Sequence, residues 1–66
     1  MRANPSQDAA RSWCAEFQIS GGAWEEDPQR FLTYAAALSY AKDLQLKLAA
    51  ITDFRIHPSR DEPTRD

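Results

Sequence analysis

One thiol and one imidazole, on Cys14 and His57, are the only groups of their kind in this 66-residue chain. A cysteine nucleophile needs a neighbouring base such as imidazole, so a mechanism of that type would have to use this pair. No third orienting residue and no oxyanion-binding loop is recognisable in the sequence. We therefore interpret Cys14 as a half-buried strand residue and His57 as a surface residue, and we predict no catalytic residue.

Three successive carboxylates, on Glu25, Glu26 and Asp27, form the one acidic cluster and could join Glu16 in binding a divalent cation. Adjacent strand residues point to alternate faces, so these oxygens are not expected to converge on an ion. A single cysteine cannot by itself make a zinc site. We predict no metal and no cofactor, and we interpret the cluster as a solvated end of a hairpin.

The basic residues are spread along the chain, and the formal net charge is -2 with a pI near 5.2. This balance disfavours nucleic acid and anionic membranes as partners, because both attract proteins through concentrated positive charge. One alternative is kept: a small dimeric nucleic-acid-binding regulator, in which dimerisation concentrates Arg30, Lys42 and Lys47. Steeply salt-dependent binding to DNA or RNA would favour that alternative.

Large aromatic residues at the rim of a small core are frequent anchors of protein interfaces. Trp24 follows the glycine pair on a short strand, and Tyr40 lies off the centre of the helical apolar stripe. Together with residues expected on an uncovered sheet face, they form the predicted partner-binding set: Trp24, Tyr40, Ile51, Arg55 and Glu16.

The length allows one domain, since so short a chain cannot supply two apolar cores. Residues 1–10 and 58–66 are polar and Pro-containing, so we predict a disordered lead-in, a folded domain over 11–57 and a disordered tail. No apolar run is long enough to span a membrane, and the start of the chain lacks the apolar region of a signal peptide. We expect a cytoplasmic location.

Strict alternation of apolar and polar residues over 12–20 predicts a strand with one buried face. The adjacent Gly21 and Gly22 suit a tight hairpin turn rather than a phosphate loop, since the longer glycine pattern of such a loop is missing. A shorter second strand should follow and end at Pro28. No small-molecule substrate is evident from these motifs.

Apolar residues spaced three or four apart from Tyr34 to Leu48 predict an amphipathic helix, with Thr33 as its N-cap. Alternation resumes over 50–57 and predicts a third strand that ends at Pro58. Ile51 breaks this alternation. Either a bulge shifts the register there or the second sheet face is partly apolar, and we favour the second reading.

These elements predict an α+β fold: a ββαβ domain with a three-stranded antiparallel sheet of order 2-1-3 and one helix packed on one face. The expected core residues are Trp13, Phe17, Ile19, Trp24, Phe31, Tyr34, Leu38, Ala41, Leu44, Leu48, Phe54 and Ile56. So small a core leaves a monomer marginally stable. Open strand edges and an uncovered sheet face then favour self-association or a protein partner.

The patterns W-x-x-x-F-x-I, G-G-x-W, F-x-T-Y-x-x-A-L-x-Y-A and I-x-D-F-R-I resemble families of uncharacterised short bacterial, phage and plasmid ββαβ domains. These motifs extend from Trp13 to Ile56 and consist of residues that determine the fold, so the resemblance implies no catalytic assignment. In size and acidic character the chain is also similar to anti-CRISPR proteins, which bind and block a host protein.

The function predicted from the sequence is a small non-enzymatic protein-interaction module. It would form a homodimer, or bind a host protein as a phage- or plasmid-encoded inhibitor or adaptor, through a sheet edge or the open sheet face. The absence of a convergent polar site and the small size of the domain favour this class over an enzyme.

Overall fold

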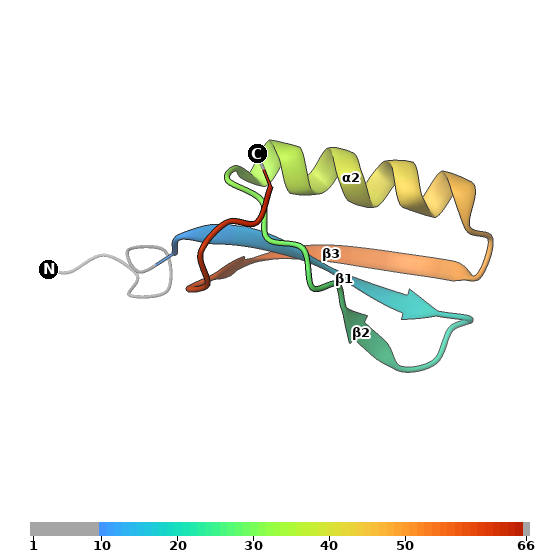
Figure 1. Cartoon of the computed structure of the whole chain (residues 1–66). Helices are drawn as coiled ribbons and strands as arrows, with labels where there is room; N and C mark the ends of the chain where they lie inside the picture. Colours follow the sequence, from blue (N-terminus) through green and yellow to red (C-terminus); the bar gives the residue numbers. More distant parts are fainter. Residues whose placement is uncertain (1–9, 66) are drawn as a thin grey trace, which may run out of the picture.

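A computed structural model describes residues 10–65 and confirms the predicted ββαβ fold. Its elements are β1 (Ser12–Ile19), β2 (Trp24–Glu26), α2 (Tyr34–Lys47) and β3 (Ile51–Ser59). The three strands form an antiparallel sheet of order β2-β1-β3, and α2 lies across one face of it (Figure 1). The lead-in predicted for residues 1–10 falls almost entirely outside the described residues.

The predicted hairpin turn joins β1 to β2, but its two positive φ angles fall on Ser20 and Gly21 instead of Gly21 and Gly22. Ser20 and Gly21 have positive φ angles of 52° and 70°, and the amide of Gly22 donates to the carbonyl of Ile19 at 2.9 Å. Two successive positive φ angles define a type I′ turn, whose twist matches that of the strands it joins. Ser20 therefore adopts the left-handed conformation, and Gly22 does not.

Helix α2 begins as predicted and packs closely through alanines. The side chain of Thr33 accepts a hydrogen bond from the amide of Ala36 at 3.1 Å, which caps the first turn. Ala37 and Ala41 are fully buried. Their small side chains allow the helix backbone to approach the sheet.

The core between α2 and the sheet is thin. Ala15, Phe17, Ala41 and Ile51 are buried at its centre, and the partly buried residues packed around them are Ile19, Tyr40, Leu44, Phe54 and Ile56. In the described part of the chain, the largest side chains that are fully buried are those of Cys14 and Ser12. On the helix side, therefore, each apolar side chain is either small or keeps some contact with solvent.

Part of the predicted core is wrong. Tyr34 and Leu48, at the two ends of α2, each expose 48% of their surface, although the ring of Tyr34 still contacts Trp13. Trp24 is half-buried on the opposite face, since it pairs with Gln18, whose side chain points away from the helix. Phe31 is buried as predicted and lies against the ring of Tyr40.

A bulge resolves the broken alternation at Ile51. The pairing of β1 with β3 shifts between Gln18 and Ile19, so that Gln18 pairs with Asp53 while Ile19 pairs with Ile51. Thr52 is the extra residue, and Ile51 turns to the helix side, where it is only 6% exposed. The expectation that Ile51 lies on the open sheet face is therefore wrong, and the bulge reading is the correct one.

Strand β3 continues past the proline that was expected to end it. Pro58 pairs with Trp13, and the strand ends at Ser59. Proline is tolerated here because β3 is an edge strand, where a missing amide can face outward.

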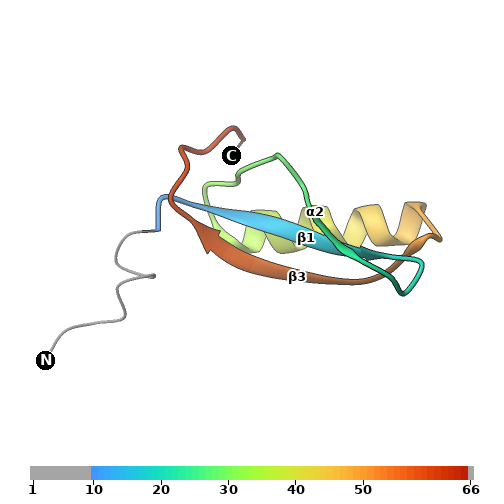
Figure 2. The ribbon, with the colours of Figure 1, turned by 90° about the horizontal axis from the view of Figure 1, so that it is seen from below.

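The chain after β3 packs on the domain, which differs from the disordered tail expected for residues 58–66. Figure 2 shows this segment curling from the end of β3 toward the segment that joins β2 to α2. Arg65 forms a parallel bridge with Phe31, and the amide of Thr64 donates to the carbonyl of Arg30 at 2.7 Å. Backbone and side-chain hydrogen bonds, rather than apolar burial, hold this polar segment.

Candidate functional site

The face of the sheet opposite α2, called the open face below, carries polar residues from all three strands. Glu16 pairs with both Glu26 and Arg55, and Cys14 pairs with His57. Directly paired residues project from the same face, so these side chains gather in one area. With Arg30 and Asp61 from the segments after β2 and β3, they form two groups: a thiol cluster (Cys14, Glu26, Arg30, His57, Asp61) and a tryptophan cluster (Glu16, Trp24, Arg55).

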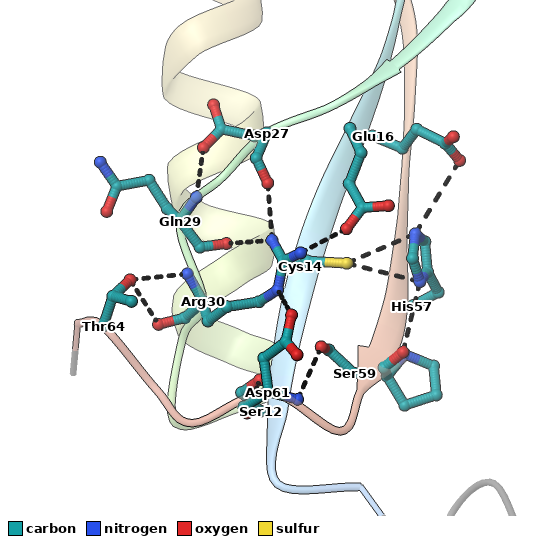
Figure 3. A network of polar contacts seen from close by, with 12 residues as sticks. Ser12, Cys14, Glu16, Asp27, Gln29, Arg30, His57, Ser59, Asp61 and Thr64 are labelled. Carbon is teal, nitrogen blue, oxygen red and sulfur yellow. Dashed lines mark hydrogen bonds and ion pairs between the residues drawn. The ribbon is translucent and has the colours of Figure 1, made fainter.

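Cys14 and His57 meet at the centre of the thiol cluster. The Cys14 sulfur lies 3.4 Å from each ring nitrogen of His57 (Figure 3). One donor atom each from Cys14, His57 and Glu26 lie within 4.8 Å of one another. The strand register therefore brings together the two residues that the sequence singled out for chemistry, and it adds a carboxylate.

The thiol is in the wrong state for a nucleophile. Burial, followed by the carboxylate of Glu26, raises the pKa of Cys14 from about 9 to about 11, and Arg30 opposes the shift. A reactive cysteine needs the reverse, a pKa lowered by nearby positive charge. At neutral pH this thiol is protonated.

Arg30 links the segment after β2 to the segment after β3. Its guanidinium donates to Glu26 at 2.5 Å, to Asp61 at 3.1 Å and to the carbonyls of Asp27 and Gln29 at 2.7 and 3.1 Å (Figure 3). The side chain is only 13% exposed. A planar fork of donors suits this arrangement, in which several acceptors converge from different directions.

The segment after β3 covers one end of the open face. The hydroxyl of Ser12 donates to the carbonyl of Asp61 at 2.7 Å, and Ser12 and Cys14 are both fully buried. The sheet face that was expected to be uncovered and partly apolar is therefore polar and, at this end, covered.

The tryptophan cluster lies farther along the same face. Arg55 donates from Nε to Glu16 at 2.6 Å, and its guanidinium carbon lies 4.1 Å from the centre of the Trp24 ring. An arginine held over an indole ring is a cation–π contact. Three of the five residues predicted to bind a partner are thus linked through Arg55.

The other two predicted residues, Tyr40 and Ile51, are on the helix side. The hydroxyl of Tyr40 donates to Asp27 at 2.8 Å, and its ring packs against Phe17 and Phe31. Burial and the bond to Asp27 raise the pKa of Tyr40. Tyr40 ties the helix to the segment after β2 and is half-buried at the rim of the core.

Sequence reasoning did not place Arg30 or Asp61 beside Cys14 and His57. Arg30 lies in a loop, and Asp61 lies in a polar segment, so neither belongs to a periodic pattern that marks a face. The signal that was present, the unique Cys14 and His57, indicated the centre of the cluster but not its composition.

Two of the three cations on which the nucleic-acid alternative depends are engaged with carboxylates. Arg30 binds Glu26 and Asp61, and Lys47 lies 2.9 Å from Asp43. These ion pairs reduce the positive field that either cation presents to a phosphate backbone.

Comparison of the chain with protein-family models, with curated proteins and with solved structures gives no match. In residues 10–65, no helix is long and apolar enough to cross a membrane. The resemblance to short phage and plasmid domains stays a prediction. A proposal for the function therefore depends on the fold and the two clusters.

Proposed function

We propose that this chain is a non-enzymatic protein-interaction module that binds a β-strand of another polypeptide along the outer edge of β3. The observation that carries the proposal is the length of that edge. Strand β3 spans Ile51–Ser59 and, within the described residues, pairs on one side only, with β1. A long unpaired edge is a template for strand addition.

The pattern of backbone hydrogen bonds identifies the groups that point outward from β3. Trp13 exchanges backbone hydrogen bonds with Phe31, and Ala15 accepts one from Asp27, so their backbone groups point away from β3. In an antiparallel pair, residues opposite such positions also direct their amides and carbonyls away from the partner. Their partners on β3 therefore form the outer edge: Phe54, Ile56 and Pro58.

Among the contacts of residues 10–65, only one amide on this stretch of the edge is left for a new strand. The amide of Phe54 already donates to the side chain of Asp53 at 2.8 Å, and Pro58 has no amide hydrogen. Ile56 thus supplies the one outward donor between Phe54 and Pro58, and carbonyl acceptors flank it. A strand that binds here must meet this donor.

Two further features support an interaction role. The described residues bury no large apolar side chain completely. A strand bound along β3 would cover apolar side chains on the helix side and add burial that the monomer lacks. The tryptophan cluster lies beside the same strand, and tryptophan and arginine are the residue types most frequent at energetic centres of interfaces. The protonated, buried thiol of Cys14 gives no support to an enzyme.

A second copy of the chain is the partner to test first, since an antiparallel edge can pair with itself about a twofold axis. The chain is short enough for chemical synthesis, which permits methylation of the Ile56 amide nitrogen with its side chain unchanged. We expect light scattering to give a concentration-dependent dimer for the unmodified chain and a monomer for the methylated one. Circular dichroism should show the same folded content for both.

A dimer that survives methylation of Ile56 would place self-association elsewhere and overturn pairing at this edge. If the unmodified chain is monomeric at all concentrations, self-pairing is wrong, and binding of a foreign protein must then be lost on methylation for the proposal to hold. A phage or plasmid origin, a cytoplasmic location and action as an inhibitor or adaptor remain part of the proposal.

A further inference from the structure

We propose that Cys14, Glu26 and His57 form a binding site for a divalent transition metal ion, with Zn²⁺ as the ion that its donor set suits best. This site lies on the open face and is independent of strand pairing along β3. Its three donors come from three adjacent strands, so the ladder itself holds them together.

The spacing of the donor atoms fits a shared ion. Zinc binds thiolate sulfur at about 2.3 Å and imidazole nitrogen at about 2.0–2.1 Å, so two such ligands on one tetrahedral ion lie about 3.5 Å apart. The Cys14 sulfur lies 3.4 Å from the ring nitrogens of His57, and the Glu26 carboxylate lies within 4.8 Å of both residues' donor atoms.

The chemistry of the donors selects the class of metal. Sulfur, nitrogen and oxygen donors together suit zinc and its transition-metal neighbours, whereas calcium and magnesium require oxygen ligands. Three protein ligands leave a fourth tetrahedral position for water. Glu26 is exposed and His57 is half-buried, so an ion can enter from their side to reach the buried Cys14.

The charges around the site favour a cation despite the presence of Arg30. Glu16 and Asp61 add two carboxylates near the ligands, while Arg30 binds oxygen Oε2 of Glu26. The other oxygen of Glu26 is then the metal ligand, and Arg30 orients the carboxylate from outside the first coordination shell. Binding releases the Cys14 proton to solvent, since the ligand is the thiolate.

Titration with Co²⁺ under reducing conditions at neutral pH tests the site directly. We expect a thiolate-to-cobalt charge-transfer absorption that saturates at one ion per chain and disappears when Zn²⁺ displaces the cobalt. Replacing Cys14 with Ser should abolish the charge-transfer absorption. If that variant does not fold, as judged by circular dichroism, His57→Asn provides the second test and should weaken binding.

The chain contains a matched control for the carboxylate ligand. Glu25 precedes Glu26 on β2 and pairs with Phe17, whose side chain points to the helix side, so Glu25 lies on the other face. We expect Glu26→Gln to weaken Zn²⁺ binding by at least the roughly 10–100-fold that loss of an outer-shell partner costs. Glu25→Gln removes the same charge and should change the affinity less than twofold.

Two results would overturn the site. One is the absence of a charge-transfer absorption when the intact, folded chain is saturated with Co²⁺. The other is a Zn²⁺ affinity that Cys14→Ser and Glu26→Gln leave unchanged, which would mean adventitious binding by surface carboxylates only.

Discussion

The backbone amide of Phe54 donates to the carboxylate of its neighbour Asp53, 2.8 Å away, on the outer side of β3. This bond occupies one of the two outward donors between Phe54 and Pro58 and leaves the other on Ile56. Edge strands commonly carry features that limit unwanted pairing, and under the proposed function Asp53 would be such a feature.

Removing the acceptor should increase strand pairing. Asp53→Ala frees the Phe54 amide, so we expect tighter self-association or partner binding, by roughly fivefold for a net hydrogen bond of about 1 kcal/mol. Light scattering over a concentration series measures the change. Asp53→Asn keeps an oxygen acceptor and serves as the control, and equal association constants for the two variants would contradict the role given to Asp53.

The position of Ile51 gives a test of the bulge. Ile51→Ala removes a buried side chain from the core and should lower the free energy of unfolding by about 2–4 kcal/mol. Leu46→Ala removes a side chain that is 87% exposed and should change that free energy by less than about 0.5 kcal/mol. Urea unfolding of both variants measures the two free energies. A small loss of stability for Ile51→Ala would indicate that the Ile51 side chain lies on the open face.

The reactivity of Cys14 follows from its pKa. In metal-free protein at pH 8, a thiol whose pKa is about 11 instead of about 9 has about 100-fold less thiolate. We therefore expect alkylation by iodoacetamide to be at least about 100-fold slower in the folded chain than in the same chain unfolded in urea. A rate equal to that of the unfolded chain would show that the thiol is neither buried nor protonated as described.

The hydrogen bond from Tyr40 to Asp27 should contribute stability that depends on pH. The raised pKa of Tyr40 means that the folded state holds this proton more tightly, so the contribution is complete below pH 10 and is lost as the pH rises through the raised value. We expect Tyr40→Phe to cost about 1 kcal/mol at neutral pH. The difference from the unaltered chain should shrink above pH 10 in urea unfolding experiments, and a constant difference would count against the bond.

Arg30 should be required for docking of the segment after β3. Arg30→Lys keeps the charge but loses the planar fork that reaches Glu26 and Asp61, so we expect a loss of about 1 kcal/mol after solvent screening of these partly exposed pairs. Faster hydrogen exchange at the amides of Thr64 and Arg65 should accompany that loss. Arg60→Lys, at an exposed position of the same segment, is the control and should leave both measurements unchanged.

The order of the elements was predictable because each depends on a local pattern. Alternation over 12–20, the three-and-four spacing after Thr33 and the glycine pair each act within a few residues, and together they specify the ββαβ fold. The bulge at Ile51 could not be assigned in the same way, since it depends on which residue of β1 lies opposite. A broken alternation indicates only that one of two registers applies.

Pro58 and the residues after it show the second limit of sequence reasoning. Proline usually ends a strand, and the exception requires knowing that β3 lies at an edge. The packing of Asp61 and Thr64 rests on hydrogen bonds to Ser12 and Arg30, which are distant in the sequence. Such contacts leave no mark in composition.

The two clusters were predictable in part for the same reason. Cys14 and His57 stood out as unique residues, but their contact follows from the register of β1 with β3. Glu16, Trp24 and Arg55 were selected separately, and the structure brings them into one contact group. Ile51 was placed on the wrong face because one bulged residue decides which way its side chain points.

The position of β1 at the centre of the sheet has a consequence for the time course of folding. Its pairing with β2 closes through the short turn at Ser20 and Gly21, whereas its pairing with β3 joins residues such as Cys14 and His57 that are far apart in sequence. Closing the longer loop costs more chain entropy and must come before both clusters exist. The hairpin and helix can therefore form early, while the chemistry of the open face is the last part of the molecule to be assembled.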